Sequence, residues 1–283
     1  MISINRYIKN IIYIYIAFSS IPLIGQAQNN TRTELDSILI DTYFSISDFK
    51  AGDSYDKVNS IIDKCEKENY LACEIEMVKW KIHQAKYLND DKTKENIKRK
   101  YENLLKESIR YNLDDLIDKY NLILITISIG VDGFEMHHEE LKNYINGIKA
   151  KNKSEFLIES YYIYWSNISL LNDYELINET REIYFKLLES QIEEDKYKFR
   201  YWDSYAMYAQ SLKNQSGYSD LLEVSEKIIL YAKEKNYLNM AKIYNFYAKF
   251  YLDRIEPTDN IDDIIESFNA IKLIKSNTLL IES

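Results

Sequence analysis

The chain has only two cysteines, Cys65 and Cys73, and they flank a predicted turn between two helices. In an exported protein, such a pair can form a disulfide that clamps the two helices together. Two buried free thiols are the alternative. The spacing is not C-x-x-C, so the pair does not point to redox catalysis.

The segment Glu135–Glu140 (EMHHEE) is the densest group of metal-ligating residue types in the chain. His137 and Glu140 would share one face of a helix, but zinc needs three or four convergent ligands. The acidic residues instead suit the first turn of a helix, where the helix dipole favours negative charge. We therefore predict no metal site here.

Recognisable catalytic motifs are missing from the sequence. It has no HExxH, no Gly-rich phosphate loop and no G-x-S-x-G turn. Acid–base or nucleophilic catalysis needs clustered functional groups, and the sequence shows no such cluster. We therefore predict that the protein is not an enzyme and has no cofactor.

Tyrosine is the most conspicuous excess, with 26 copies in 283 residues. Aromatic side chains can stack on sugars or grip an extended peptide, and core filling is the alternative use. On the helix near residues 199–209, one predicted core stripe comprises Phe199, Trp202, Ala206 and Ala209. That stripe leaves Tyr201, Tyr205 and Tyr208 as the best candidates for an exposed face. The full candidate ligand- or partner-binding set is Tyr161, Tyr164, Trp165, Tyr201, Tyr205 and Tyr208.

Long helices are the elements that must position these side chains. The chain is 46% hydrophobic but contains only 6 Gly and 2 Pro, which disfavours a strand-and-turn architecture. Apolar residues recur at the i, i+3, i+4, i+7 spacing of an amphipathic helix. Val58, Ile61, Ile62 and Cys65 are one such set, and the pattern recurs along the chain. The sequence predicts an all-α fold.

Leu122–Ile129 (LILITISI) is the one segment that would also suit a buried strand, because it is rich in β-branched residues. A lone strand without a pairing partner would leave backbone groups unsatisfied. We therefore predict a helix here as well.

Predicted helix ends recur at a regular interval, at Asn69, Asn112, Asn152, Asp195 and Asn236, which are 40–43 residues apart. Asn tolerates the left-handed conformation that closes a helix. The interval predicts five helix–turn–helix repeats of about 40–43 residues that stack as an α-solenoid. The predicted helix pairs are 54–88, 93–130, 135–171, 174–213 and 218–253.

The first 27 residues match a secretory signal peptide. Arg6 and Lys9 precede the apolar run Ile11–Ile24, and Gly25–Ala27 supplies small residues at the −3 and −1 positions of a cleavage site before Gln28. The apolar run is short for a membrane span, although an uncleaved anchor is the alternative. We predict a periplasmic or secreted protein that is not inserted in the membrane after cleavage.

Residues 28–53 then form a leading helix, and residues 54–283 form the repeat domain. A last predicted helix, Ile261–Ile274, lacks a full partner. An unpaired helix leaves apolar surface exposed. Three explanations stay open: a missing C-terminal continuation, a homodimer contact through this helix, or a capping role.

The net charge of −9 limits the class of partner. An acidic surface repels phosphate backbones, and no stripe of Lys and Arg stands out against it. Nucleic acid is therefore excluded from the expected partners.

The repeat pattern resembles the tetratricopeptide-repeat superfamily in its longer, irregular form. The second helix of that motif places two small residues seven positions apart, as Ala241 and Ala248 do here. The Trp-Leu-Gly-Tyr signature of the first helix is not found in this sequence. The proline expected at the repeat end is matched only by Pro257. A signal peptide followed by such repeats is similar to the sensory halves of bacterial envelope regulators.

Together these features lead us to expect an exported scaffold that binds a protein or peptide, for example as the sensory part of a signalling system. The alternative is capture of a small ligand or glycan by an aromatic-rich concave face. Such capture would resemble the helical glycan-binding lipoproteins of bacterial outer membranes, although the lipid-attachment Cys of those proteins is absent here.

Overall fold

A computed structural model describes most of the chain between residues 55 and 255. The described residues are 34–35, 38, 55–171, 173–192, 195–235, 238–255, 262, 264–266 and 269. The predicted signal peptide (1–27) lies outside them, as do most of the leading segment (28–53) and of the C-terminal helix (261–274). None of the described helices combines the length and apolar character that crossing a membrane requires.

The described part of the chain is all-α and contains no strand, which confirms the predicted fold class. Leu122–Ile129 lies inside a long helix, as predicted. Five helix pairs occupy the predicted positions, with bounds that differ from the sequence expectation by a few residues. The helices are α2 (Tyr55–Lys67), α3 (Leu71–Tyr87), α4 (Asp91–Arg110), α5 (Asp114–Asp132), α6 (Phe134–Lys151), α7 (Ser154–Asn167), the 3₁₀ helix η1 (Ile168–Leu171), α8 (Tyr174–Glu189), α9 (Asp195–Leu212), α10 (Gln215–Lys235) and α11 (Leu238–Ile255).

Asparagines close the turns where the sequence placed them. Asn69, Asn112 and Asn152 have φ angles of 47°, 53° and 54°, in the left-handed region that Asn tolerates. Asn89 has the same conformation (φ 52°) between two helix pairs. The expectation for Asp195 was wrong, because this residue begins α9 instead of ending a helix. Asn236 lies outside the described residues.

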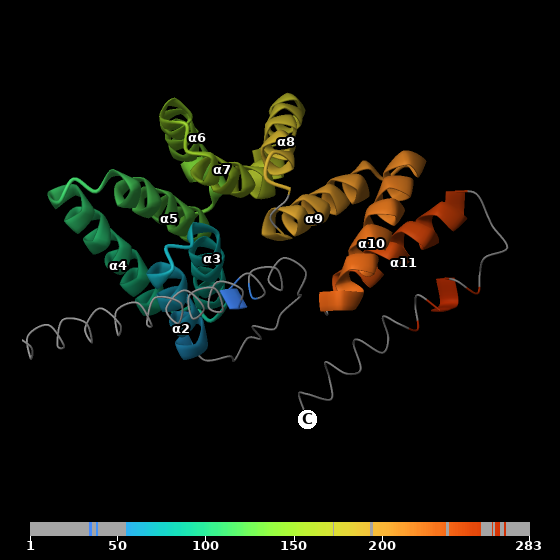
Figure 1. Cartoon of the computed structure of the whole chain (residues 1–283), viewed down its shortest axis with the longest axis horizontal. Helices are drawn as coiled ribbons and strands as arrows, with labels where there is room; N and C mark the ends of the chain where they lie inside the picture. Colours follow the sequence, from blue (N-terminus) through green and yellow to red (C-terminus); the bar gives the residue numbers. More distant parts are fainter. Residues whose placement is uncertain are drawn as a thin grey trace, which may run out of the picture.

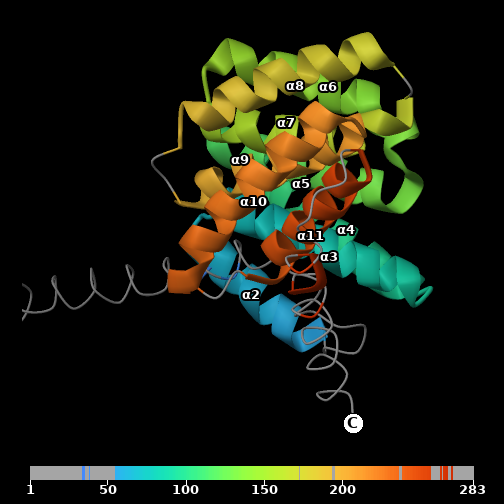
Figure 2. The same ribbon diagram turned by 90° about the vertical axis from the view of Figure 1, so that its right-hand side faces the viewer.

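The second helices of the first three pairs pack together, whereas the first helices of successive pairs diverge. Helices α3, α5 and α7 contact one another, and each helix also packs on its neighbour in the chain. Helices α4, α6 and α8 fan outward from this centre (Figure 1), and α6 and α8 lie on the same side of α7 (Figure 2). Neighbouring helices thus pack as a repeat fold requires, while a regular solenoid remains a prediction.

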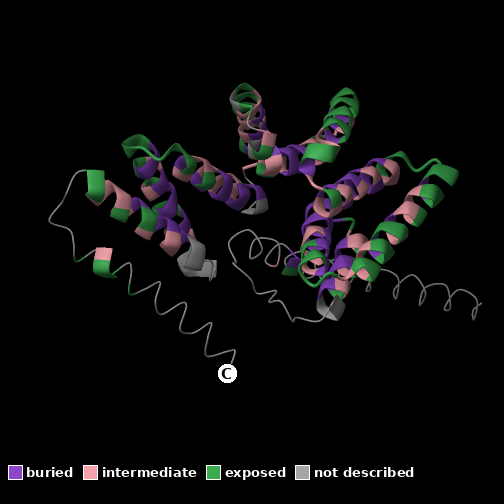
Figure 3. Ribbon diagram, turned by 180° about the vertical axis from the view of Figure 1, so that it is seen from behind, coloured by how far each residue is buried: buried purple, intermediate pink, exposed green. Residues whose placement is uncertain are grey.

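Buried residues form two apolar clusters, which we call the first core and the second core. The first core runs from Leu35 to Tyr197 and includes the contacts of α2–α8. The second core begins at Phe199 and is formed by α9, α10 and α11. Buried positions follow the faces on which these helices meet (Figure 3). Helix α9 therefore contributes to both cores.

Cys65 and Cys73 face each other across the turn between α2 and α3. Their Cα atoms are 5.8 Å apart, their sulfur atoms lie at bonding distance, and both side chains are buried in the first core. A Cα separation of this size is usual for disulfide-bonded cysteines, so the disulfide stays our prediction.

We predict that reduction of this disulfide lowers the free energy of unfolding by about 2–3 kcal/mol. The cross-link restricts the unfolded chain, and the short length of the closed loop limits the gain to this size. Urea unfolding with and without a strong reductant measures the change. Reductant should not shift the midpoint of the Cys65→Ala/Cys73→Ala variant. A wild-type midpoint that is indifferent to reductant would show that the thiols are not joined.

Candidate functional site

The structure divides the six candidate aromatic residues into two groups. Tyr161 and Tyr164 are only 5% and 3% exposed and belong to the first core. The ring of Tyr164 packs edge-on against Phe134, with 5.4 Å between the ring centroids. These two tyrosines serve the core and do not belong to an exposed face.

Three of the other four candidates gather around Phe185 of α8, and the fourth, Tyr208, contacts Tyr205. The Phe185 ring lies 5.8 Å from that of Trp165 on α7, 5.4 Å from that of Tyr201 and 6.1 Å from that of Tyr205. All are partly exposed. We call this surface the aromatic face and define it as Trp165, Phe185, Tyr201, Tyr205 and Tyr208.

The antiparallel register of α8 and α9 builds the aromatic face. On α8, residues 181, 185 and 189 are four apart and so share one side of the helix. They meet α9 in reverse order, with the Arg181 guanidinium 4.5 Å from the ring centre of Tyr208 and the Tyr201 hydroxyl donating to Glu189 at 3.3 Å. The rings of Tyr201 and Tyr205 stack almost parallel, 6.1 Å apart.

The opposite side of α9 anchors this face. Phe199, Ala206 and Ala209 are fully buried in the second core. This stripe is the one that the sequence predicted, and it turns the three tyrosines toward α8. The aromatic face therefore rests on a helix whose rotation is fixed by packing.

Carboxylates lie near the hydroxyl groups of the face. Burial and the neighbouring Glu189 raise the pKa of Tyr201 to about 12. Burial and Asp220 of α10 likewise raise the pKa of Tyr205. Tyrosine is protonated at neutral pH even at its ordinary pKa, and the raised pKa values keep both hydroxyls as hydrogen-bond donors at higher pH as well.

Comparison with known proteins identified no relative of this chain. No model of a known protein family, no curated protein and no solved structure matches the chain. The assignment of a function must therefore depend on the site geometry.

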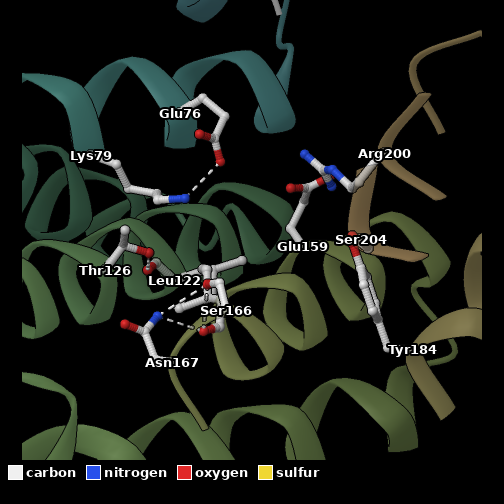
Figure 4. Close-up of polar contacts among 11 residues, drawn as sticks. Glu76, Lys79, Leu122, Thr126, Glu159, Ser166, Asn167, Tyr184, Arg200 and Ser204 are labelled. Atoms are coloured by element: carbon white, nitrogen blue, oxygen red, sulfur yellow. Dashed lines mark hydrogen bonds and ion pairs between the residues drawn. The ribbon is translucent and has the colours of Figure 1, made fainter. Parts of the chain in front are cut away.

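Next to the aromatic face, and missed by the sequence prediction, lies a buried group of charged residues that joins α7 to α9. The Arg200 Nη1 atom is 2.6 Å from Glu159 Oε1, and the two side chains are 1% and 0% exposed (Figure 4). Burying either charge alone would be strongly unfavourable, so the pair ties the two helices together. We call this group and its neighbours the charged cluster: Glu76, Lys79, Glu159, Tyr162, Arg200 and Asp203.

Tyr162 is the centre of the charged cluster. The Arg200 guanidinium lies 4.3 Å from its ring centre and the Lys79 ammonium 4.6 Å from it. Lys79 also pairs with Glu76 at 2.9 Å. Cations near an aromatic ring are attracted by its quadrupole, more strongly when they are desolvated. The ring thereby links α3, α7 and α9.

Asp203 extends the charged cluster to α11. The Tyr244 hydroxyl donates to its Oδ1 atom at 3.1 Å. Burial raises the pKa of Asp203 to about 7, and the nearby Glu76 adds to the shift, while Tyr244 and Arg200 oppose it. This carboxyl group therefore changes protonation near neutral pH.

Charged residues within apolar helices were the available signal for these contacts. Glu74, for example, lies in the apolar sequence LACEIEMV, and in the first core it pairs with Lys119 at 2.7 Å and accepts from Tyr101 at 2.8 Å. The partners of these charged residues lie far away in the sequence, so residue spacing could not predict the contacts.

The candidate metal ligands around His137 form only local contacts. His137 Nδ1 lies 3.0 Å from Glu140, and Nε2 lies 3.2 Å from Asp132. Among the described residues, no group of three or more His, Cys, Asp or Glu side chains could hold a metal ion. We assign this segment no ligand.

The variant Arg200→Met should lose about 3–5 kcal/mol of unfolding free energy, because it leaves the Glu159 carboxylate buried without its cation. Chemical denaturation at neutral pH measures the loss. The double variant Glu159→Leu/Arg200→Met should recover most of it, because no charge is then left unpaired. An equally large loss in the double variant would contradict this explanation.

The raised pKa of Asp203 makes the free energy of unfolding depend on pH. Because its folded pKa is raised, the folded protein holds more protons than the unfolded chain between about pH 4 and pH 7, so this group destabilises the fold as pH rises. Asp203→Asn should therefore gain on the order of a few kcal/mol over wild type at pH 8 and much less at pH 5. Denaturation of both proteins across this range gives the difference, and a constant difference would refute the assignment.

Proposed function

We propose that this protein is an exported helical-repeat scaffold that binds a protein or peptide, and that it is not an enzyme. The aromatic face is the observation that carries the proposal. Its five side chains come from three helices, are partly exposed and touch one another. Aromatic side chains dominate the binding energy of many protein interfaces because they bury a large area at a small entropic cost.

The position of the face supports a binding role. Helices α8 and α10 both pack on α9 but diverge on either side of it (Figure 1). Neither helix covers the tyrosines of α9 completely. A partner segment could lie along α9 and use the prearranged rings as its contact surface.

The wider assignment belongs to the same proposal. Asn-closed helix pairs and the packing of α3, α5 and α7 are compatible with a TPR-like repeat. The signal-peptide pattern in residues 1–27 supports a place in the periplasm or outside the cell. There the scaffold could serve as the sensory part of a signalling system, and the C-terminal helix could form a homodimer contact.

Glycan capture is the second candidate, and one observation favours it. The rings of Tyr201 and Tyr205 are inclined by only 6° to each other, so they present similar orientations to a ligand. Flat aromatic surfaces of this kind can stack against sugar rings. The two candidates use the same residues and differ only in the ligand.

Selection of displayed random peptides against the purified protein tests the proposal. We expect peptides that bind wild type and lose binding to the variant Tyr201→Ala/Tyr205→Ala/Tyr208→Ala. The control variant Tyr87→Ala/Tyr111→Ala removes two tyrosines that are 72% and 63% exposed elsewhere on the surface, and it should bind normally. Circular dichroism of each variant verifies that the helices remain folded.

A glycan array probed with the same three proteins separates the two candidates. Peptide binding that depends on the α9 tyrosines supports the scaffold, and glycan binding with this dependence supports the alternative. Failure to select any peptide, or selection of peptides that bind the triple variant equally well, would overturn the scaffold proposal.

A further inference from the structure

Two carboxylates at the edge of the aromatic face have no cationic partner among the described side chains. Glu189 accepts from the Tyr201 hydroxyl at 3.3 Å, and Asp220 lies close enough to Tyr205 to raise its pKa. The nearby Glu223 is different, because Lys227 neutralises it at 2.6 Å. Negative charge is thus concentrated beside the Tyr201 and Tyr205 rings.

Some tyrosine rings elsewhere in the protein have both an acidic neighbour and a cation at the ring. Tyr162 has Lys79 and Arg200 at its ring and Glu159 paired with that arginine. At the end of the aromatic face, Arg181 lies over Tyr208. The other two α9 tyrosines of the face, Tyr201 and Tyr205, have acidic neighbours but no cation over their rings among the described residues.

We propose that the aromatic face binds a segment of a partner protein that carries lysine or arginine side chains. This inference rests on the proposed binding function and specifies the chemistry of the partner. A basic side chain would lie against the Tyr201 or Tyr205 ring and pair with Glu189 or Asp220. The ring supplies a cation–π attraction, and the carboxylate supplies a charge-assisted hydrogen bond.

The charge of Arg181 limits where the basic segment can bind. Its guanidinium occupies the Tyr208 end of the face and repels a second cation there. The partner's basic side chains are therefore directed to the other end, where Tyr201 and Glu189 meet. The Tyr208 end is better suited to an apolar or acidic residue of the same segment. This asymmetry gives the bound segment a preferred direction.

Fluorescence anisotropy with defined peptides tests the inference. The probes are labelled Gly/Ser peptides of equal length in which alternate residues are all Arg, all Gln or all Glu. We expect the Arg peptide to bind and the Gln and Glu peptides to bind at least about fivefold more weakly. Binding of the Arg peptide should also weaken as salt is added, because the carboxylates are close to solvent.

Matched variants locate the contact. Glu189→Gln and Asp220→Asn should each weaken Arg-peptide binding about threefold to fivefold. Glu182→Gln removes an exposed carboxylate of α8 that the face does not use, and it should leave binding unchanged. Tyr205→Phe keeps the ring and should bind well, whereas Tyr205→Leu keeps apolar bulk without a ring and should bind weakly.

The outcomes separate this inference from the proposed function. If the Gln or Glu peptide binds best and Tyr205→Leu abolishes its binding, the face binds peptides but the basic specificity is wrong. If the Arg peptide binds equally well to Glu182→Gln, Glu189→Gln and Asp220→Asn, the attraction is general and the inference falls. If no probe binds, the inference falls, while selection from random peptides still decides the scaffold proposal.

Discussion

The buried pairing of Arg200 with Glu159 is the constraint on which the arrangement of α9 depends. A guanidinium and a carboxylate that are both removed from water must stay together, since separating them would leave a buried charge without compensation. The pair therefore fixes how α9 is rotated against α7. Tyr201 follows Arg200 directly and points about 100° further around the helix, toward α8. This polar contact and the buried apolar stripe of α9 thus together determine which side chains form the aromatic face.

The same physical strategy operates in the first core. Glu74 on α3 meets Tyr101 on α4 and Lys119 on α5, so a single buried carboxylate joins three helices. Apolar contacts alone are not directional and allow helices to slide against each other. Paired charges have defined geometry and favour one register over its neighbours. The two cores are accordingly joined and positioned by polar contacts, while most of their area is apolar.

The helices and their turns could be predicted from the sequence because both depend on residues that are close together in the chain. Amphipathic spacing places the apolar stripe of α9, and Asn at positive φ closes the turns at Asn69 and Asn152. The burial of Tyr161 and Tyr164 is not local, because α7 contacts α3, α5, α6 and α8 and is therefore covered on several sides. The charged cluster is non-local for the same reason. Its members come from helices that the sequence does not pair.

The residues that stabilise α9 and those that we propose for binding lie on different sides of this helix. The inner side carries Arg200, whose partner cannot be removed without leaving a buried charge. The outer side carries tyrosines that keep contact with solvent, and substitutions at partly exposed positions disturb folding much less. Changes in the aromatic face could therefore alter the proposed binding while the charged cluster keeps α9 in place. This division lets the exposed side chains of α9 change without loss of the fold, which is a property that the proposed binding scaffold would need.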